Sequence, residues 1–379
     1  MPDPKVFIAK CSSYDSTAVD AAVEAAFDAF GGAGALIRPG DRVLVKPNLL
    51  MAWPMEGAVT THPAVVESVV RRLQDCGARV TIGDSPGIGS AAKVADRCGI
   101  AEVARRLGVE MVEFQPVEMR TNEGLFRRFE VAREAVEADL IINLPKLKSH
   151  GQMVLTAAVK NLFGCVVGHR KAQWHMHAGR DRDAFATMLL ELARLLEPHF
   201  SIVDGIVGMD RNGPSAGRVR DIGVILAGSD ALAIDRIAAR IAGLPEQQFP
   251  LVRAAAASGA FSDSLGAIEI AGAPVESCII DDFELPEAVD VEFGPRLLRG
   301  PLRKAMAATP AVDHAECRQC LACVRACPPG AMALADGRIT IDRRKCISCF
   351  CCQEMCPHQA INVRRGWLAR LLIRRGHLK

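Results

Sequence analysis

The stretch ADLIINLPKLKSH (138–150) places a short apolar run directly before a cluster of basic side chains. Similar apolar, β-branched runs recur along the chain and alternate with amphipathic segments. The predicted strands are 42–48, 78–84, 109–114, 138–145, 200–206 and 221–228, and the predicted helices are 16–30, 63–77, 183–197 and 230–243. Apolar strands between amphipathic helices are typical of parallel strands covered on both faces. We therefore expect an α/β domain over residues 1–295, with a largely parallel sheet flanked by helices.

A second pattern, C-x2-C-x2-C-x3-C-P, begins at Cys317 and again 29 residues later at Cys346. Thiolates at this spacing bind an iron–sulfur cube, and the cysteine before the proline ligates the other cube. The arrangement resembles bacterial two-cluster ferredoxins, which implies two 4Fe–4S clusters and a small α+β ferredoxin-like domain over 313–363. By this resemblance the first cluster is held by Cys317, Cys320, Cys323 and Cys356, and the second by Cys346, Cys349, Cys352 and Cys327.

Two structural zinc sites are the alternative interpretation, because four-cysteine zinc sites also use C-x2-C pairs. Zinc does not require a third spaced cysteine or a terminal Cys-Pro, so the duplicated pattern favours clusters. Cys351 lies outside the pattern and is predicted to be a passive thiol. The remaining cysteines are predicted to be buried small hydrophobes: Cys11, Cys76, Cys98, Cys165 and Cys278.

Composition and charge argue against a nucleic-acid-binding protein and against a membrane-spanning one. The formal net charge is only +2 over 379 residues, so global electrostatics does not favour a nucleic-acid partner. The N-terminus lacks the pattern of a signal peptide, and no run of 18 apolar residues could span a membrane. We therefore expect a cytoplasmic protein without a transmembrane span.

Two further segments follow from composition. Residues 296–312 are predicted to link the domains, and 364–379 form a basic tail. A helix in this tail would place four apolar side chains on one face, namely Trp367, Leu368, Leu371 and Leu372. Such a helix can contact an anionic membrane or an acidic partner, although fraying or packing against its own domain is commoner for a terminal segment.

Polar side chains gather after the predicted strands of the larger domain, in VLVKPNLL (43–50), VTIGDSPGIGSAA (80–92) and the region from 143 to 177. Together with TTHP (60–63), DGIVGMDRNGPSAG (204–217) and DALAIDRIAARIAG (230–243), these motifs resemble the family called domain of unknown function 362. The likeness covers roughly residues 10–290. It implies an iron–sulfur partner domain but no settled reaction.

Open α/β sheets bind ligands at the carboxyl ends of their strands. Lysines and histidines there could bind an anionic substrate or transfer protons. The predicted catalytic residues are Lys46, Asp84, Lys146, Lys148, His150 and Lys160. The alternative is that these lysines are solvated and the histidines only hydrogen-bonded in place.

The segment GDSPGIGSAA (83–92) imitates a dinucleotide fingerprint, with Glu113 near the end of the next strand-like run. A loop for a phosphate or carboxylate, or a plain tight turn, is the favoured interpretation, and the predicted cofactor-binding residues are Gly87, Gly89 and Asn161. His175 and His177 are interpreted as surface or catalytic histidines rather than metal ligands. Asp204 and the loop 208–217 are predicted to form a mobile binding loop or an exposed hairpin.

Three functional hypotheses remain. The first is an iron–sulfur oxidoreductase or electron-transfer protein that wires electrons to an anionic small molecule, and it predicts a pocket lined by Lys46, Asp84, Lys146, Lys148 and His150. The second is a non-enzymatic electron carrier or maturation factor, whose large domain presents a flat surface to a redox protein or other partner. The third, by loose fold-level analogy with lactate racemase, is a non-redox enzyme with structural clusters.

Overall fold

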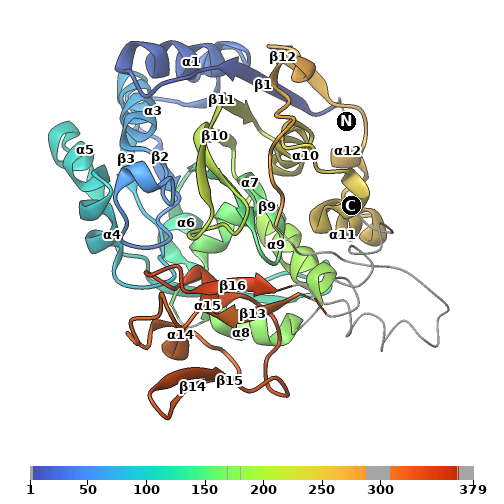
Figure 1. The fold of residues 1–379 in the computed structure, drawn as a ribbon. Coiled ribbons are helices and arrows are strands. Elements are labelled where there is room, and N and C mark those ends of the chain that lie inside the picture. Colours follow the sequence, from blue (N-terminus) through green and yellow to red (C-terminus); the bar gives the residue numbers. More distant parts are fainter. Residues whose placement is uncertain (1–2, 169, 180, 287–307, 365, 367–379) are drawn as a thin grey trace.

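The computed structural model describes residues 3–168, 170–179, 181–286, 308–364 and 366. A large α/β domain precedes a smaller, strand-rich C-terminal domain, drawn in orange and red in Figure 1. Most of the predicted linker 296–312 and of the basic tail 364–379, including its four apolar residues, lies outside the described residues. Among the described helices, none combines the length and the apolarity needed to cross a membrane.

The large domain is built on a ten-stranded mixed sheet in the order β12-β1-β11-β10-β7-β2-β3-β4, with β8 and β9 added beside β10. Its strands are β1 (Lys5–Lys10), β2 (Arg42–Pro47), β3 (Arg79–Ile82), β4 (Glu110–Met111), β7 (Leu140–Leu144), β8 (Lys146–His150), β9 (Val154–Thr156), β10 (Phe200–Asp210), β11 (Arg218–Gly228) and β12 (Glu269–Gly272). Strands β4, β3, β2, β7 and β10 pair in parallel, which confirms the largely parallel sheet.

Strands β10 and β11 differ from the expectation of parallel neighbours. They form an antiparallel hairpin, because residues 211–217 are too short for the crossover that parallel strands need. Asp204 therefore lies inside β10 rather than in a loop, and its side chain is fully buried. The part of the prediction that placed Asp204 in a binding loop was wrong.

Helices cover both faces of the sheet (Figure 1). One hydrophobic core contains Val43 and Val45 of β2 with helices α1 (Ser16–Asp28), α3 (Pro63–Asp75), α4 (Ala91–Arg97) and α5 (Ile100–Leu107). The other contains Leu44 with α7 (Ala158–Asn161), α9 (Arg182–Leu196), α10 (Ala231–Ile241) and α11 (Pro250–Ser258). Alternate residues of one apolar strand thus enter opposite cores, as expected for a sheet buried on both faces.

The remaining elements of this domain are short. They are α2 (Ala33–Leu36), α6 (Arg133–Glu137), α8 (Arg170–Ala178), α12 (Ser262–Leu265), the hairpin of β5 (Pro116–Arg120) with β6 (Arg128–Ala132), and the 3-10 turns Met55–Gly57, Leu162–Cys165, Glu246–Gln248 and Val275–Cys278.

The strand order creates a switch point beside β2. The chain runs from β2 outward through β3 to β4 and then returns to β7 on the other side of β2. Connections leaving neighbouring strands in opposite directions open a crevice at their carboxyl ends, where α/β proteins bind ligands.

The C-terminal domain is a structural repeat. Strand β13 (Thr309–Val312) pairs with β16 (Ile361–Arg364), and β14 (Met332–Ala335) pairs with β15 (Arg338–Ile341). Helices α14 (Ala322–Arg325) and α15 (Cys351–Glu354) begin 29 residues apart. The residue before each helix, Leu321 or Phe350, adopts a left-handed φ of 61° or 60°. The duplicated cysteine motifs therefore fold alike.

Candidate functional site

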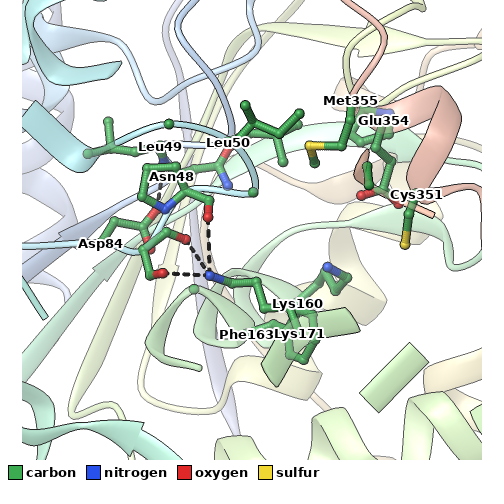
Figure 2. A pocket seen from close by; sticks show the side chains of 18 of the residues that line it. Asn48, Leu49, Leu50, Asp84, Lys160, Phe163, Lys171, Cys351, Glu354 and Met355 are labelled. Carbon is green, nitrogen blue, oxygen red and sulfur yellow. Dashed lines mark hydrogen bonds between the residues drawn. The ribbon is translucent and has the colours of Figure 1, made fainter. Parts of the chain in front are cut away.

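A cavity of about 700 Å³ lies between the two domains (Figure 2). The large domain contributes the loop after β2, the loop of residues 84–91, strand β8 and helices α7 and α8. The small domain contributes residues 325–328 and part of the segment 351–355. The predicted site residues that line the cavity are Asp84, Lys146, Lys148, His150, Lys160, Gly87, Gly89 and Asn161. Lys46 is not among the lining residues; it is fully buried and forms an ion pair with Asp84, which does line the cavity.

Lys46 and Asp84 form a buried ion pair at the ends of β2 and β3. Lys46 Nζ donates to Asp84 Oδ1 at 2.8 Å and to the carbonyl oxygen of Pro47 at 3.0 Å. The other carboxylate oxygen of Asp84 accepts from the amide of Leu49 at 2.6 Å. A Cβ at Gly164 would lie 2.0 Å from Asp84 Oδ1, so this position requires glycine. The pair fixes the strand ends that shape the cavity.

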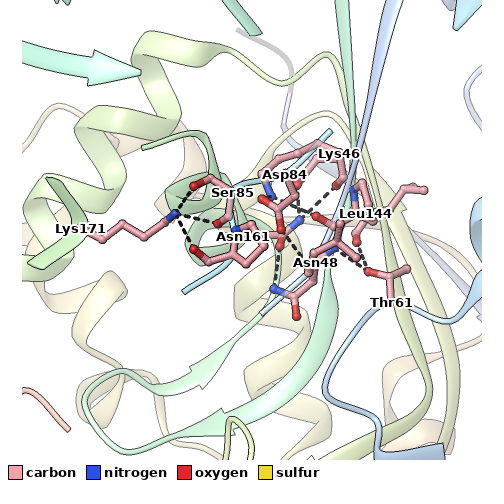
Figure 3. Close-up of polar contacts among 12 residues, drawn as sticks. Lys46, Asn48, Thr61, Asp84, Ser85, Leu144, Asn161 and Lys171 are labelled. Carbon is pink, nitrogen blue, oxygen red and sulfur yellow. Dashed lines mark hydrogen bonds and ion pairs between the residues drawn. The ribbon is translucent and has the colours of Figure 1, made fainter. Parts of the chain in front are cut away.

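Asn161 connects strands at the floor of the cavity (Figure 3). Its Nδ2 donates to the carbonyl oxygen of Lys46 at 3.2 Å and to Asn143 Oδ1 at 2.8 Å. Its Oδ1 accepts from Asn48 Nδ2 at 3.0 Å. Both donors of this amide are therefore used within the protein, which gives Asn161 a positioning role and leaves its predicted cofactor contact untested.

Lys146 belongs to a second buried network. Its Nζ donates to Asp204 Oδ2 at 2.8 Å and lies 2.6 Å from the hydroxyl of Tyr14. Tyr14 also donates to Asp204 Oδ1 at 2.8 Å and stacks on His62, with 3.5 Å between ring centroids. Burial lowers the pKa of Lys146, and Asp204 opposes that shift.

Lys148 faces the cavity without a carboxylate partner. Its Nζ donates to Asn48 Oδ1 at 2.8 Å and to the carbonyl oxygen of Val59 at 2.7 Å. Burial, together with the neighbouring charges of Lys146 and Lys160, lowers its pKa to about 7. At neutral pH this amine therefore exists in both protonation states.

Lys160 is the least compensated cation of the cavity. Among the described residues it forms no hydrogen bond or salt bridge, and its Nζ lies over the ring of Phe163 at 4.6 Å from the centroid. Burial lowers its pKa, while the charge of Glu354 opposes the shift. In Figure 2 its side chain lies between the Asp84 side of the cavity and the Glu354 side.

Lys171 fastens the loop of residues 84–91 to α8 (Figure 3). Its Nζ donates to the carbonyl oxygen of Ser85 at 2.6 Å, to Ser85 Oγ at 2.8 Å and to the carbonyl oxygen of Pro86 at 3.4 Å. Burial lowers its pKa to about 7. Sequence analysis placed Lys171 in the polar region from 143 to 177 but did not select it as a site residue.

The loop itself does not match a dinucleotide fingerprint. The amides of Ser85 and Gly87 donate to carbonyl oxygens of Gly164 and Leu50, so they are not free for a phosphate. Helix α4 after the loop has only seven residues. A Cβ at Gly87 would lie 2.3 Å from Met355 Cε, so this glycine permits close contact with the small domain.

Contacts between the domains centre on α15. His150 Nε2 lies 2.9 Å from Glu354 Oε1, although the two groups are not aligned for a hydrogen bond. Ser215 Oγ donates to the carbonyl oxygen of Glu354 at 2.7 Å, and Gln353 Nε2 donates to that of Asn212 at 2.6 Å. The β10–β11 hairpin loop therefore docks the small domain.

Glu354 brings a carboxylate into the basic cavity. Its burial raises the pKa, but His150, Lys160 and His175 outweigh that effect and hold the pKa at about 2. Burial lowers the pKa of His150, which keeps the imidazole neutral at pH 7. Sequence analysis missed Glu354, because nothing in the cysteine motif indicates that it reaches another domain.

The two histidines of α8 have different surroundings. His175 is buried against Phe185, lines the cavity and has a pKa lowered to about 3 by burial. His177 is exposed. Within the described ranges, no group of three or more His, Cys, Asp or Glu residues is placed to hold a single metal ion.

The cluster cysteines separate into two groups of four. One small cavity is lined by Cys317, Cys320, Cys323 and Cys356. Another is lined by Cys327, Cys346, Cys349 and Cys352. The amide of Ala331 donates to Cys327 Sγ at 3.1 Å, and 29 residues later the amide of Ala360 donates to Cys356 Sγ at 3.3 Å. Such donors stabilise ligating thiolates. The grouping fits two clusters and supports the predicted ligand sets.

Comparison with known proteins gives two family matches. Residues 43–240, more than half of the chain, match the domain of unknown function 362, and residues 309–357 match a 4Fe-4S dicluster domain. The chain is 36% identical over 300 residues to a thylakoid-associated protein of Synechocystis sp., covering 79% of this chain and 93% of that protein.

One solved structure is more distantly similar. It is the lactate racemase apoprotein from Thermoanaerobacterium thermosaccharolyticum, with 12% identity and a TM-score of 0.42. The match covers 60% of this chain and 54% of the racemase chain, so the chain spans about half of that length. A likeness at this level carries no argument about activity.

Proposed function

Because the chain belongs to the family of the domain of unknown function 362 and ends in a 4Fe-4S dicluster domain, we propose that it is an iron–sulfur oxidoreductase for an anionic small molecule. The dicluster domain makes iron–sulfur electron transfer its coarse function. The observation that carries the finer proposal is that Lys148 and Lys160 line the same cavity as Cys327, a predicted cluster ligand.

Cavity size and charge support a small-molecule site. A volume of about 700 Å³ is within the range of ligand pockets, roughly 300–1,000 Å³. Basic side chains without carboxylate partners attract an anion, and their burial strengthens that attraction. The competing hypothesis of a docked protein partner expects a flat surface over these residues, so the cavity favours the oxidoreductase.

Each residue has a separate part in the proposed reaction. The two predicted sets of four cysteines would hold the clusters, and each cluster would supply one electron to a bound substrate. Lys148 and Lys160 bind the anion, and Lys148 Nζ, with its pKa near 7, can donate or accept a proton at neutral pH. The exposed Cys320 marks the end of the small domain where a redox protein would deliver electrons.

The experiment is an anaerobic reoxidation screen. Protein with about eight iron and eight sulfide is reduced with dithionite, freed of excess reductant and mixed with a panel of organic anions. We expect one class of anion to reoxidise the wild type and the exposed-site control Lys93→Met, but to act slowly on Lys160→Met. Equal reoxidation of wild type and Lys160→Met by every anion would refute the proposal.

The predicted cytoplasmic location stays a prediction. The printed name of the Synechocystis relative associates that protein with thylakoids. Fractionation of the full chain between membranes and supernatant tests both the location and the predicted tail contact.

A further inference from the structure

We infer that the interdomain cavity takes an organic dianion, either a dicarboxylate or a phosphate monoester, with its charged oxygens at Lys148 and Lys160. The inference rests on the proposed function, because it assigns the substrate class of the same site. It follows from the charge balance, the unused donors and the size of the cavity.

With Lys148, Lys160 and Lys171 all protonated, the charge balance leaves an excess of two positive charges. Three lysines of the cavity, Lys148, Lys160 and Lys171, have no carboxylate within hydrogen-bonding distance. The other lysine of the lining, Lys146, is neutralised by Asp204. Glu354, counted as ionised, offsets one of the three charges, and the exposed Glu113 and Arg325 at the rim offset each other. Buried charges are stable only when they are paired, so a ligand with two negative charges completes the site.

The unused donors indicate where the ligand oxygens lie. Lys171 uses its three N–H groups on Ser85 and Pro86, so it contributes charge and holds the loop. Lys148 uses two of its three N–H groups, and Lys160 donates none of its N–H groups to a described residue. His175 Nδ1, in the wall of the cavity, is also buried without a hydrogen-bond partner. Free donors therefore remain on Lys148 and Lys160.

The three lysines differ in how strongly groups of the small domain affect them. A thiolate-bound cluster is negatively charged, and Lys160 has the small domain's Glu354 and Cys351 among its main electrostatic neighbours. The groups that most affect Lys171 are Asp84, Lys46, Lys160 and Cys165, all in the large domain. Those that most affect Lys148 are Lys146, Lys160, Glu354 and Asp84. Lys160 thus has two small-domain groups among its main electrostatic neighbours, Lys148 has one, and Lys171 has none.

The size of the cavity argues for an organic body rather than an inorganic ion. A volume of about 700 Å³ lies within the range of pockets that hold drug-sized ligands. Apolar residues of both domains also line it, namely Leu49, Leu50, Ile88, Phe163, Val167 and Met355. A ligand body lying along these side chains would approach Cys327.

The test is titration calorimetry on the oxidised, cluster-loaded protein. The probes are naphthalene dicarboxylate, naphthyl phosphate, the monoanion naphthoate, and sulfate. We expect at least one dianion to bind about 10–100-fold more tightly than naphthoate, the effect of one further charged hydrogen bond. Lys160→Met should lose that margin, while the exposed Lys93→Met keeps it. Which dianion prevails distinguishes a dicarboxylate from a phosphate ester.

Proton linkage gives a second readout. The pKa of Lys148 and of Lys171 is about 7 in the free protein. A bound anion favours the charged amines, so the protein should take up protons when the anion binds near pH 7.5. Affinity should fall as the pH rises above 7.

Three results would overturn the inference: equal affinity for naphthoate and both dianions, no binding of either dianion, or equal dianion binding by Lys160→Met and wild type. If Lys160→Met shifted only the cluster potential, the lysines would serve the clusters. Dianion binding without any reoxidation would support this inference and refute the proposed oxidoreductase.

Discussion

Replacing Asp84 by asparagine removes the charge that compensates Lys46 inside the protein. Lys46 is 0% exposed and Asp84 is 3% exposed, and their Nζ and Oδ1 atoms lie 2.8 Å apart. Removing one partner of a buried pair costs about 3–5 kcal/mol, because the other charge stays buried and uncompensated. In the wild type, the two carboxylate oxygens of Asp84 accept from Lys46 Nζ and from the backbone amide of Leu49. The side-chain NH₂ group of asparagine would face one of these two donors and could not accept its hydrogen bond. We therefore expect Asp84→Asn to lower the free energy of unfolding by about 4 kcal/mol.

The assay is urea denaturation under anaerobic conditions, followed by far-ultraviolet circular dichroism. The matched control is the double variant Lys46→Met/Asp84→Leu, which removes both charges and keeps an apolar side chain at each position. It should cost less than Asp84→Asn alone, because no buried charge is left unpaired. A loss below about 1 kcal/mol for Asp84→Asn, the value of a surface pair, would refute the reasoning.

Three further predictions concern other positions. Gly164→Ala should strongly destabilise the fold in thermal unfolding, because its Cβ would lie 2.0 Å from a buried carboxylate oxygen, whereas Gly34→Ala, with no atom within 4 Å, should not. Burial raises the pKa of Asp235 to about 7, so this group favours folding below about pH 4 and loses that contribution as the pH rises through 7. Between about pH 4 and pH 7, the free energy of unfolding of Asp235→Asn should therefore rise relative to that of wild type. Parallel curves of unfolding free energy against pH would contradict the raised pKa of Asp235. Cys323→Ser should lower bound iron from about eight to about four, while Cys351→Ser keeps about eight; equal loss in both would show that the ligand set is wrong.

The strands of the large sheet could be predicted from sequence because burial on both faces makes them continuously apolar. The run at 138–145 appears as β7, and 42–48 appears as β2, each within two residues of its expected bounds. Strand β1, which pairs with β11 and β12, was missed because the lysines at its two ends leave only four apolar residues between them.

The residues of the cavity could be predicted only in part. Lys148 and His150 follow a buried strand, and parallel strands bring such residues to one edge. Sequence cannot tell whether a polar side chain at that edge meets a ligand or a neighbour, and Asn161 and Asp204 meet neighbours. Glu354 was missed because its place depends on how two folded domains dock.

The measurement that tests the central claim most directly is electron–nuclear double resonance on the dithionite-reduced protein, with a carbon-13-labelled form of the tighter-binding dianion probe. If the cavity holds its ligand beside the cluster of Cys327, carbon-13 coupling to the reduced cluster should appear in wild type and in Lys93→Met, and should be lost in Lys160→Met. A bound probe without carbon-13 coupling in wild type would contradict the account, because the ligand would then lie away from the path of the electrons.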